Sequence, residues 1–259
     1  MKNSTILSGT GNYVSISVRF IIGVMLVLLV SLNMASLVHA VDSDSNVPIT
    51  DESSRQLDQF GYEGTVPDKV WEAAYNGLTP FLKSIPVQDL VHYGFPAGTG
   101  FEDISLGKPY RVHTILPEKL LHYSTNQDIR SLVTTTAMWF FPVLQKGEPR
   151  TILTVDLMDG EWQAVAIGSS GLMEQLYNME QRWSDRNNYK RILVRVFQAR
   201  SDIMLVSDGD ELSIAPFGSA IIALGIEKSD PDAIKLYQVP EIMEKLVPVV
   251  QENVNQGIK

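Results

Sequence analysis

Three apolar, β-prone runs separated by short turn sequences constrain the fold more than any other feature of this chain. The runs occupy residues 137–144 (AMWFFPVL), 151–157 and 162–167. Between them lie two turn sequences, 145–148 (QKGE) and Asp159-Gly160. Asp-Gly between alternating apolar residues is typical of a two-residue hairpin turn. We therefore predict an antiparallel meander in the centre of the chain.

A helix and further strands surround this meander. Apolar residues recur at helical spacing after Ser170, and this stripe needs an apolar surface to cover. The segment 219–226 (SAIIALGI) fits either a buried strand or a helix. Further strands are predicted at 110–115, 191–197, 203–206 and 212–214. The pattern predicts an α+β fold, an antiparallel sheet of hairpins with helices packed on one face.

Prolines mark several expected boundaries. Pro67 suits the first turn of a helix, and Pro240 is expected to open a C-terminal helix. Pro80 is expected to begin a second short turn, and Pro248 to kink or end the regular part of the last helix. Pro142 interrupts a β-prone run, which indicates a sheet edge or a bulge.

The N-terminal region has the pattern of an export signal. The uncharged apolar run 20–32 follows Arg19 and precedes Val38-His39-Ala40, where small residues favour cleavage after Ala40. The alternative is a retained membrane anchor over 20–41, because a spanning helix needs roughly 20 apolar residues. Both interpretations place the following chain outside the cytoplasm, in the periplasm or secreted, and membrane association is expected only if the anchor is retained.

The remainder divides into a tether and a folded part. Residues 41–61 are acidic and Ser-rich and read as a flexible linker. Residues 62–259 are predicted to form a single α+β domain, with a division near Asn187 as the alternative. The chain has no cysteine, so it has no disulfide framework and no thiolate metal site.

Charge argues against nucleic acid as a partner. The full chain carries 21 Lys and Arg and 30 Asp and Glu, a formal net charge of −9. Removal of residues 1–40 deletes two basic residues and no acidic one, which leaves −11. Nucleic-acid-binding proteins need clustered positive charge, whereas a net negative charge mainly favours solubility.

Three histidines form the best metal candidate. His92, His113 and His122 fall within a short stretch that also contains several carboxylates. Imidazole with carboxylate can hold zinc. The spacings match no metal motif, however, and half-buried structural histidines are the competing interpretation. No cofactor-binding motif is present, so no cofactor is expected.

Other short motifs fail the tests for chemistry. The sequence Gly168-Ser169-Ser170-Gly171 lacks the spacing of a nucleophile elbow, and helix capping accounts for its serines. The lone Gly98-Thr99-Gly100 follows no clear strand, so turn geometry is preferred to a phosphate loop. The acidic run 208–211 lacks the alternating ligands of a calcium loop and reads as a hairpin turn.

The aromatic cluster at 138–141 is the remaining candidate for binding. On a strand Trp139 and Phe141 point to one face, while Met138 and Phe140 point to the other. Burial of both pairs is the preferred interpretation. The alternative is an exposed strip of Trp139 and Phe141 that recruits a partner, including by strand addition at an edge.

No catalytic arrangement is apparent in this sequence. We therefore expect an exported, non-catalytic binding module for a peptide, protein or small ligand, a class that includes inhibitors and accessory proteins. Its partner would be another envelope or secreted protein or peptide. Two alternatives stay open: an envelope hydrolase with a His and carboxylate metal site, and a membrane-anchored assembly factor.

Overall fold

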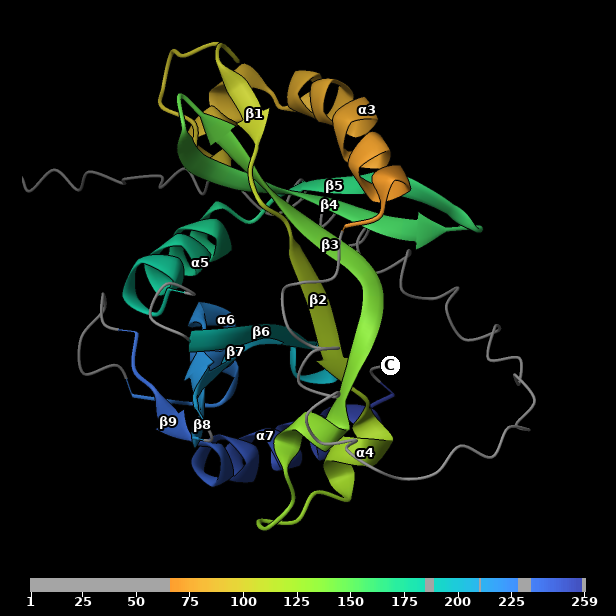
Figure 1. Cartoon of the computed structure of the whole chain (residues 1–259), viewed down its shortest axis with the longest axis vertical. Coiled ribbons are helices and arrows are strands. Elements are labelled where there is room, and N and C mark those ends of the chain that lie inside the picture. Colours follow the sequence, from red (N-terminus) through yellow and green to blue (C-terminus); the bar gives the residue numbers. More distant parts are fainter. Residues whose placement is uncertain (1–65, 185–188, 210, 228–233, 258–259) are drawn as a thin grey trace, which may run out of the picture. The chain divides into compact units, whose positions relative to one another are not determined.

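Alternating helices and strands make up the part of the chain that the computed structural model describes, residues 66–184, 189–209, 211–227 and 234–257. The helical elements are α3 (Asp68–Ser84), η2 (Val87–Tyr93), α4 (Pro117–Leu121), η3 (Ile129–Leu132), α5 (Ser170–Arg182), η5 (Phe197–Ala199), α6 (Gly218–Ala223) and α7 (Val239–Asn255). The strands are β1 (Ile104–Leu106), β2 (Tyr110–Ile115), β3 (Val133–Gln145), β4 (Glu148–Met158), β5 (Glu161–Gly168), β6 (Tyr189–Val196), β7 (Ser201–Asp208), β8 (Glu211–Pro216) and β9 (Tyr237–Gln238). Figure 1 shows their arrangement.

The strands of this region form one nine-stranded sheet. Its order is β5-β4-β3-β2-β6-β7-β8-β9, and β1 pairs separately with β3. Every described pair is antiparallel except β2 with β6. That parallel pair has only two register positions, Val112↔Leu193 and His113↔Val194. The predicted α+β class and its antiparallel sheet are therefore confirmed.

The two predicted hairpin turns of the meander form as expected. Lys146-Gly147 and Asp159-Gly160 all have positive φ, between 53° and 83°. Two successive residues of this kind make the tight turn whose twist matches that of the flanking strands. The turns set the register of β3 with β4 and of β4 with β5 next to each turn, and a bulge displaces each register farther along the strands.

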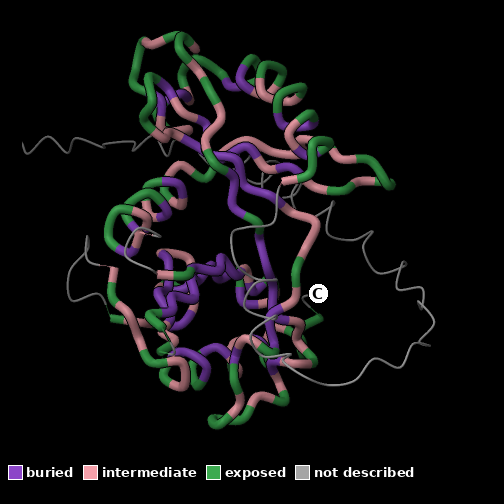
Figure 2. The backbone as a smooth tube through the Cα atoms, in the orientation of Figure 1, coloured by how far each residue is buried: buried purple, intermediate pink, exposed green. Residues whose placement is uncertain are grey.

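Side chains of β3 alternate between two hydrophobic cores. Trp139 and Phe141 pack in one cluster with Val70 and Ala74 of α3. Phe140, between them, packs in another cluster with Leu176 of α5. The strand is buried at these positions, as Figure 2 shows in purple for the central strands. Burial of the aromatic cluster on both faces, the preferred interpretation of the sequence, is confirmed.

A third cluster lies under the C-terminal helix. Ile242, Leu246 and Val250 of α7 pack with Val194 of β6 and Leu205 of β7. The neighbouring residues Leu193 and Met204 belong instead to the α5 cluster. Because adjacent strand residues point to opposite faces, α7 and α5 cover opposite sides. Helices thus lie on both faces of the sheet, whereas the sequence led us to expect them on one.

Pro142 lies inside the sheet, at a point where the missing N–H costs nothing. On one side it pairs with Ile152 of β4. On the other side β3 passes from β2, at Phe140, to β1, at Val143, and Gly107 N donates to Pro142 O over 2.8 Å. In an antiparallel ladder the N–H and C=O of a residue face the same neighbour. The proline nitrogen therefore faces the gap between two strands rather than a sheet edge.

The helices continue through two prolines that we expected to interrupt them. Pro80 lies inside α3 and does not begin a separate turn, and Pro248 lies inside α7, which continues to Asn255. A proline frees the carbonyl four residues earlier. That position is Asn76 in α3 and Glu244 in α7, and both are exposed, so water can hydrate the freed carbonyl. Apolar packing of each helix then outweighs the local break.

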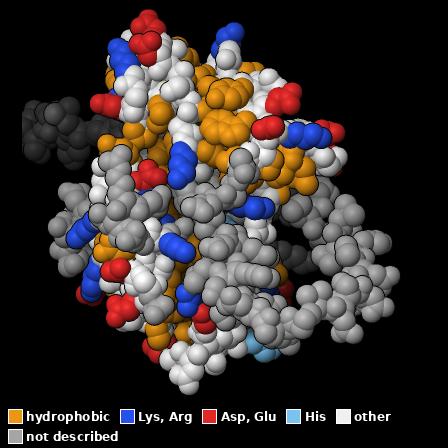
Figure 3. Space-filling view, viewed as in Figure 1, with side chains coloured by type: hydrophobic (Ala, Val, Ile, Leu, Met, Phe, Trp, Pro, Cys, Tyr) orange, Lys and Arg blue, Asp and Glu red, His pale blue; other side chains and the backbone are white. Residues whose placement is uncertain are grey.

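Hydrophobic side chains gather over α3 on the face shown in Figure 3. Tyr75 is 60% exposed and its ring stacks on Trp71, with centroids 5.6 Å apart. Trp71 in turn meets Phe141 edge-on at 4.9 Å.

Within the described ranges no helix is both long and apolar enough to cross a membrane. The candidate signal or anchor at 20–41 and the tether at 41–61 lie outside those ranges.

Close packing of α3 on β5 predicts a cost for the smallest possible substitution. A Cβ added at Gly77 would lie 2.1 Å from the Cβ of Ala164, closer than real Cβ contacts. We expect Gly77→Ala to destabilise the protein by about 1–3 kcal/mol, although alanine is the better helix former. Urea unfolding measures the change.

Two variants control this experiment. Gly171→Ala near the start of α5 meets no atom within 4 Å and should be neutral or stabilising by up to about 1 kcal/mol. Adding Ala164→Gly to Gly77→Ala should recover part of the loss, because it removes the opposing methyl group. If Gly77→Ala unfolds like Gly171→Ala, α3 does not pack this closely.

Candidate functional site

A pocket of about 310 Å³ lies between the loop that precedes β1 and the hairpin that joins β3 to β4. This volume is at the lower end of the range of about 300–1,000 Å³ for ligand pockets. Three charged side chains, two uncharged polar side chains, two glycines and one proline make up the lining. The lining residues are Pro96, Gly98, Thr99, Gly100, Glu102, Gln145, Lys146 and Arg150.

The loop that forms one wall is held from within. Helix η2 ends at Tyr93, and its C-cap Gly94 has a φ of 83°, in the left-handed region. The next residue, Phe95, is buried and meets Phe101 edge-on at 5.3 Å. Thr99 Oγ1 donates to Pro96 O over 2.7 Å. The segment between these aromatic anchors therefore presents its glycines and Thr99 at the pocket.

Hydrogen bonds from the hairpin attach it to this loop. Gln145 is buried, and its Nε2 donates to Gly100 O over 2.8 Å. The backbone N–H of Lys146 donates to Asp103 O over 3.0 Å. Both wall segments are thus fixed to each other at the end of β3, and the pocket does not depend on a loose loop.

Arg150 reaches the pocket because β4 bulges at this residue. Val143 pairs with Thr151 and Leu144 pairs with Pro149, which leaves Arg150 as the extra residue of β4. Bulges re-aim side chains and are common beside functional sites. Gly94 fits against this bulge: a Cβ there would lie 2.2 Å from Arg150 O.

Only part of the Arg150 guanidinium is engaged. Its Nη2 pairs with Glu148 Oε2. Its Nε is buried and has no hydrogen-bond partner among the described residues. The Arg150 side chain is 25% exposed, so the group is partly desolvated but still open to the pocket. The chemistry of the lining is therefore that of polar recognition: two cations, one carboxylate, a hydroxyl and loop backbone.

The structure places the three candidate histidines on separate elements. His92 lies exposed in η2, with Nδ1 4.0 Å from Asp89. His113 is buried in β2 at the parallel pair with β6. His122 follows α4, and its Nδ1 contacts Glu118 O at 2.6 Å. Across the described ranges no three His, Cys, Asp or Glu residues form a group that could hold a metal ion.

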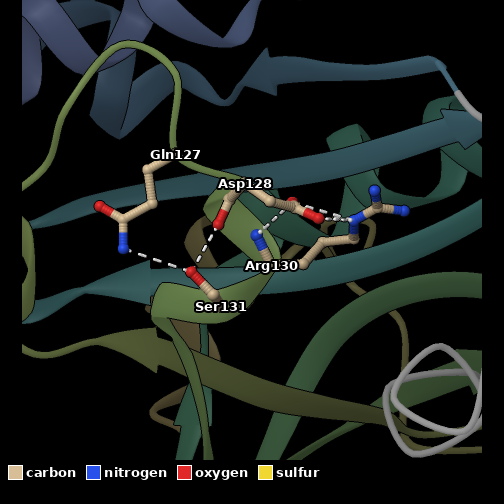
Figure 4. Close-up of polar contacts among 4 residues, drawn as sticks. All are labelled: Gln127, Asp128, Arg130 and Ser131. Atoms are coloured by element: carbon tan, nitrogen blue, oxygen red, sulfur yellow. Dashed lines mark hydrogen bonds and ion pairs between the residues drawn. The ribbon is translucent and has the colours of Figure 1, made fainter. Parts of the chain in front are cut away.

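Asp128, one of the carboxylates near these histidines in the sequence, has a local structural role (Figure 4). It caps η3 by accepting from Arg130 N over 2.9 Å, and its carboxylate pairs with Arg130 Nε. Its carbonyl accepts from Ser131 Oγ, which also accepts from Gln127 Nε2. Partial burial favours a higher pKa for Asp128, but the hydrogen bonds and charge of Arg130 outweigh it and lower the pKa.

The aromatic binding candidates lie in the core. Trp139 is 6% exposed and Phe141 is fully buried, both beneath α3. The cation of Arg111 lies 5.3 Å from the centre of the Trp139 ring. These two residues therefore offer no apolar strip to a partner in this conformation, and their arrangement fits a packing role.

The serine motif serves the backbone in an unexpected way. Ser169 occupies the N-cap position of α5 with a φ of 63°, but its side chain makes no cap hydrogen bond, so our expectation of side-chain capping there is wrong. Ser170 Oγ donates instead to His92 O over 3.0 Å.

In the acidic run 208–211, Asp208 pairs with Glu211 across a hairpin turn, as expected. Asp210 lies outside the described residues.

The pocket is the feature that sequence reasoning missed. The sequence predicts Gly98-Thr99-Gly100 and residues 145–148 as turns, with nothing to indicate that they lie side by side. The bulge at Arg150 follows from strand register, which no local pattern in this sequence reveals.

Comparison with known proteins finds no similar protein: no family model, curated protein or solved structure matches the chain.

Burial of His113 predicts a specific pH dependence of stability. Desolvation lowers the pKa of His113 to about 4; the charge of Arg111 adds to this effect, and hydrogen bonds with the Leu193 and Arg111 backbone oppose it. In the unfolded chain the pKa of this histidine is near 6.5, so the unfolded chain binds the proton at a higher pH than the folded protein does. The contribution of the neutral His113 side chain to the free energy of unfolding is complete above about pH 6.5. It falls by about 3 kcal/mol as the pH decreases to about 4.

Replacement by a residue that does not titrate isolates this contribution. Urea unfolding of the wild type and of His113→Gln at pH 7 and pH 4.5 measures the difference in slope. The wild type should lose more stability than the variant over this interval, whatever the variant costs at pH 7. Equal losses would contradict a neutral, buried His113.

Proposed function

We propose that this protein is an exported, non-catalytic binding module that holds a small polar ligand, or the polar end of a peptide, between the loop at 96–102 and the β3–β4 hairpin. The observation that carries the proposal is the pocket itself. It combines a glycine-containing loop, two cationic side chains and one carboxylate on a fixed part of the sheet. A few convergent polar groups in a concave site are typical of ligand recognition.

The lining supports binding rather than a reaction. Among the lining residues, Thr99 has the only hydroxyl side chain, and it already donates to a backbone carbonyl. Nucleophilic catalysis needs a base within hydrogen-bond reach of such a group. Arg150 and Lys146 supply positive charge and hydrogen-bond donors, which can orient a ligand.

Export is the second part of the proposal and rests on residues 1–40. If the signal is cleaved after Ala40, the mature protein begins at Val41. Mass spectrometry of the protein recovered from its native cells reads this N-terminus. A chain retaining residues 20–41 in the membrane fraction would instead support the anchored alternative.

Filling the pocket tests the binding site directly. Gly100 lacks positive φ, and a Cβ there would meet no atom within 4 Å, so Gly100→Phe can enter open space without backbone strain. We expect at least one probe among amino acids, monosaccharides, dicarboxylates and polyamines to raise the melting temperature of the wild type by several degrees at 100-fold excess over Kd. Gly100→Phe should abolish that shift.

The matched control is Gly171→Phe, the same substitution at another open glycine outside the pocket lining. It should retain the ligand-induced shift. The proposal fails if no probe class stabilises the wild type, or if the stabilising probe acts equally on Gly100→Phe.

A further inference from the structure

We infer that the pocket selects a ligand with a single carboxylate, of the kind that a free amino acid or the C-terminus of a short peptide provides. This inference rests on the proposed function and names the chemistry of its ligand. The charges around the pocket, the geometry of Arg150 and the position of Glu102 lead to it in turn.

The first step is the local charge balance. Lys146 and Arg150 contribute two positive charges to the lining, and Glu102 contributes one negative charge. Glu148 lies beside them through its ion pair with Arg150. The four groups together are close to neutral, so the pocket has no excess positive charge with which to attract a phosphate dianion. A ligand that pairs one carboxylate with one positive group is the better match to two cations that share their surroundings with two carboxylates.

The second step is the incomplete use of Arg150. A guanidinium has five N–H donors in a planar fork that matches the two oxygens of a carboxylate. Glu148 takes one edge at Nη2, and neither Nε nor Nη1 donates to another described residue. A buried donor without an acceptor destabilises the protein. Nε is enclosed by the protein, so a carboxylate entering the pocket would approach the guanidinium at Nη1, which donates to no described residue.

The third step is the fixed position of the cation. The β-bulge aims Arg150, and the backbone of Gly94 packs directly against Arg150 O. Lys146 follows Gln145, which is tied to the opposite wall at Gly100. The backbone of Lys146 and the guanidinium of Arg150, which pairs with Glu148, are therefore positioned at one wall before a ligand binds. Preorganisation of this kind reduces the entropy that binding would otherwise cost.

Glu102 gives the ligand its second polar end. It lines the same pocket and is exposed, with no described ion pair to Lys146 or Arg150. A ligand that carries an ammonium group beside its carboxylate can satisfy both signs of charge at once. The α-ammonium and α-carboxylate of an amino acid, or the two ends of a dipeptide, meet this requirement.

Calorimetry on the purified protein tests the inference with four probes: L-alanine, L-alanyl-L-alanine, L-alaninamide and inorganic phosphate. We expect alanine or alanyl-alanine to bind, and whichever binds more tightly identifies the source of the carboxylate. Alaninamide keeps the ammonium group but lacks the carboxylate, so it should bind at least tenfold more weakly. Phosphate should bind more weakly than the better carboxylate probe.

Two variants of one ion pair separate charge from structure. Arg150→Gln should weaken binding of the carboxylate probe at least tenfold. Glu148→Gln breaks the same ion pair but releases the guanidinium, so it should leave the affinity unchanged or increase it. A purely structural role of the pair would instead make both variants lose affinity together.

The outcomes distinguish this inference from the proposed function. If a neutral sugar or a polyamine binds and Gly100→Phe blocks it, the pocket is a binding site but the carboxylate inference is wrong. If alaninamide or phosphate equals alanine, or Arg150→Gln has no effect, the inference is overturned as well. If none of the probes binds the wild type, both fail.

Discussion

The alternation of large aromatic side chains along β3 is the constraint on which the rest of the structure depends. Trp139 and Phe141 contact the core under α3, while Phe140 belongs to the core with α5. The same strand pairs with β1, β2 and β4. A shift by one residue would send each aromatic ring to the opposite core. Register along β3 therefore fixes two helices and three strands at once.

The end of this strand also positions the candidate site. Beyond Val143 the pairing of β3 with β4 is displaced by one residue, and the extra residue is Arg150. Gln145, the last residue of β3, is tied to Gly100 of the loop opposite. The pocket thus depends on how β3 ends: the core packing fixes the register of the strand, and the bulge in β4 places Arg150 in the pocket lining.

Local signals in the sequence were sufficient for most of the sheet. The turns at Lys146-Gly147 and Asp159-Gly160 and the apolar runs beside them predict β3, β4 and β5, because short-range chemistry determines a hairpin. Competition between local and tertiary effects explains the failures. Pro80 and Pro248 are unfavourable for a helix locally, yet α3 and α7 continue through them because their apolar faces are buried.

The candidate site was beyond the reach of such local signals. Its walls are separated in the sequence and meet through hydrogen bonds of Gln145 and Lys146 and through the close approach of Gly94 to Arg150. The histidines show the converse: they are near one another in the sequence, but β2 and η2 carry them to different surroundings. Residues close in the sequence predict a turn well. They predict a binding or metal site only where the fold also keeps their side chains close in space.

The single parallel pair in the sheet has a consequence for how the chain reaches this fold. The antiparallel strands on either side, β2 to β5 and β6 to β8, are consecutive strands of the chain. Tight turns join β3 to β4 and β4 to β5, and a longer connection with α4 and η3 joins β2 to β3. The parallel pairing of Val112 with Leu193 instead brings together two strands that are separated in the sequence by β3, β4, β5 and α5. Closing a long loop costs entropy before its contacts form. We expect the strands β2 to β5 and the strands β6 to β8 to pair early as two separate groups. The pairing of β2 with β6 should form late and set the rate of folding.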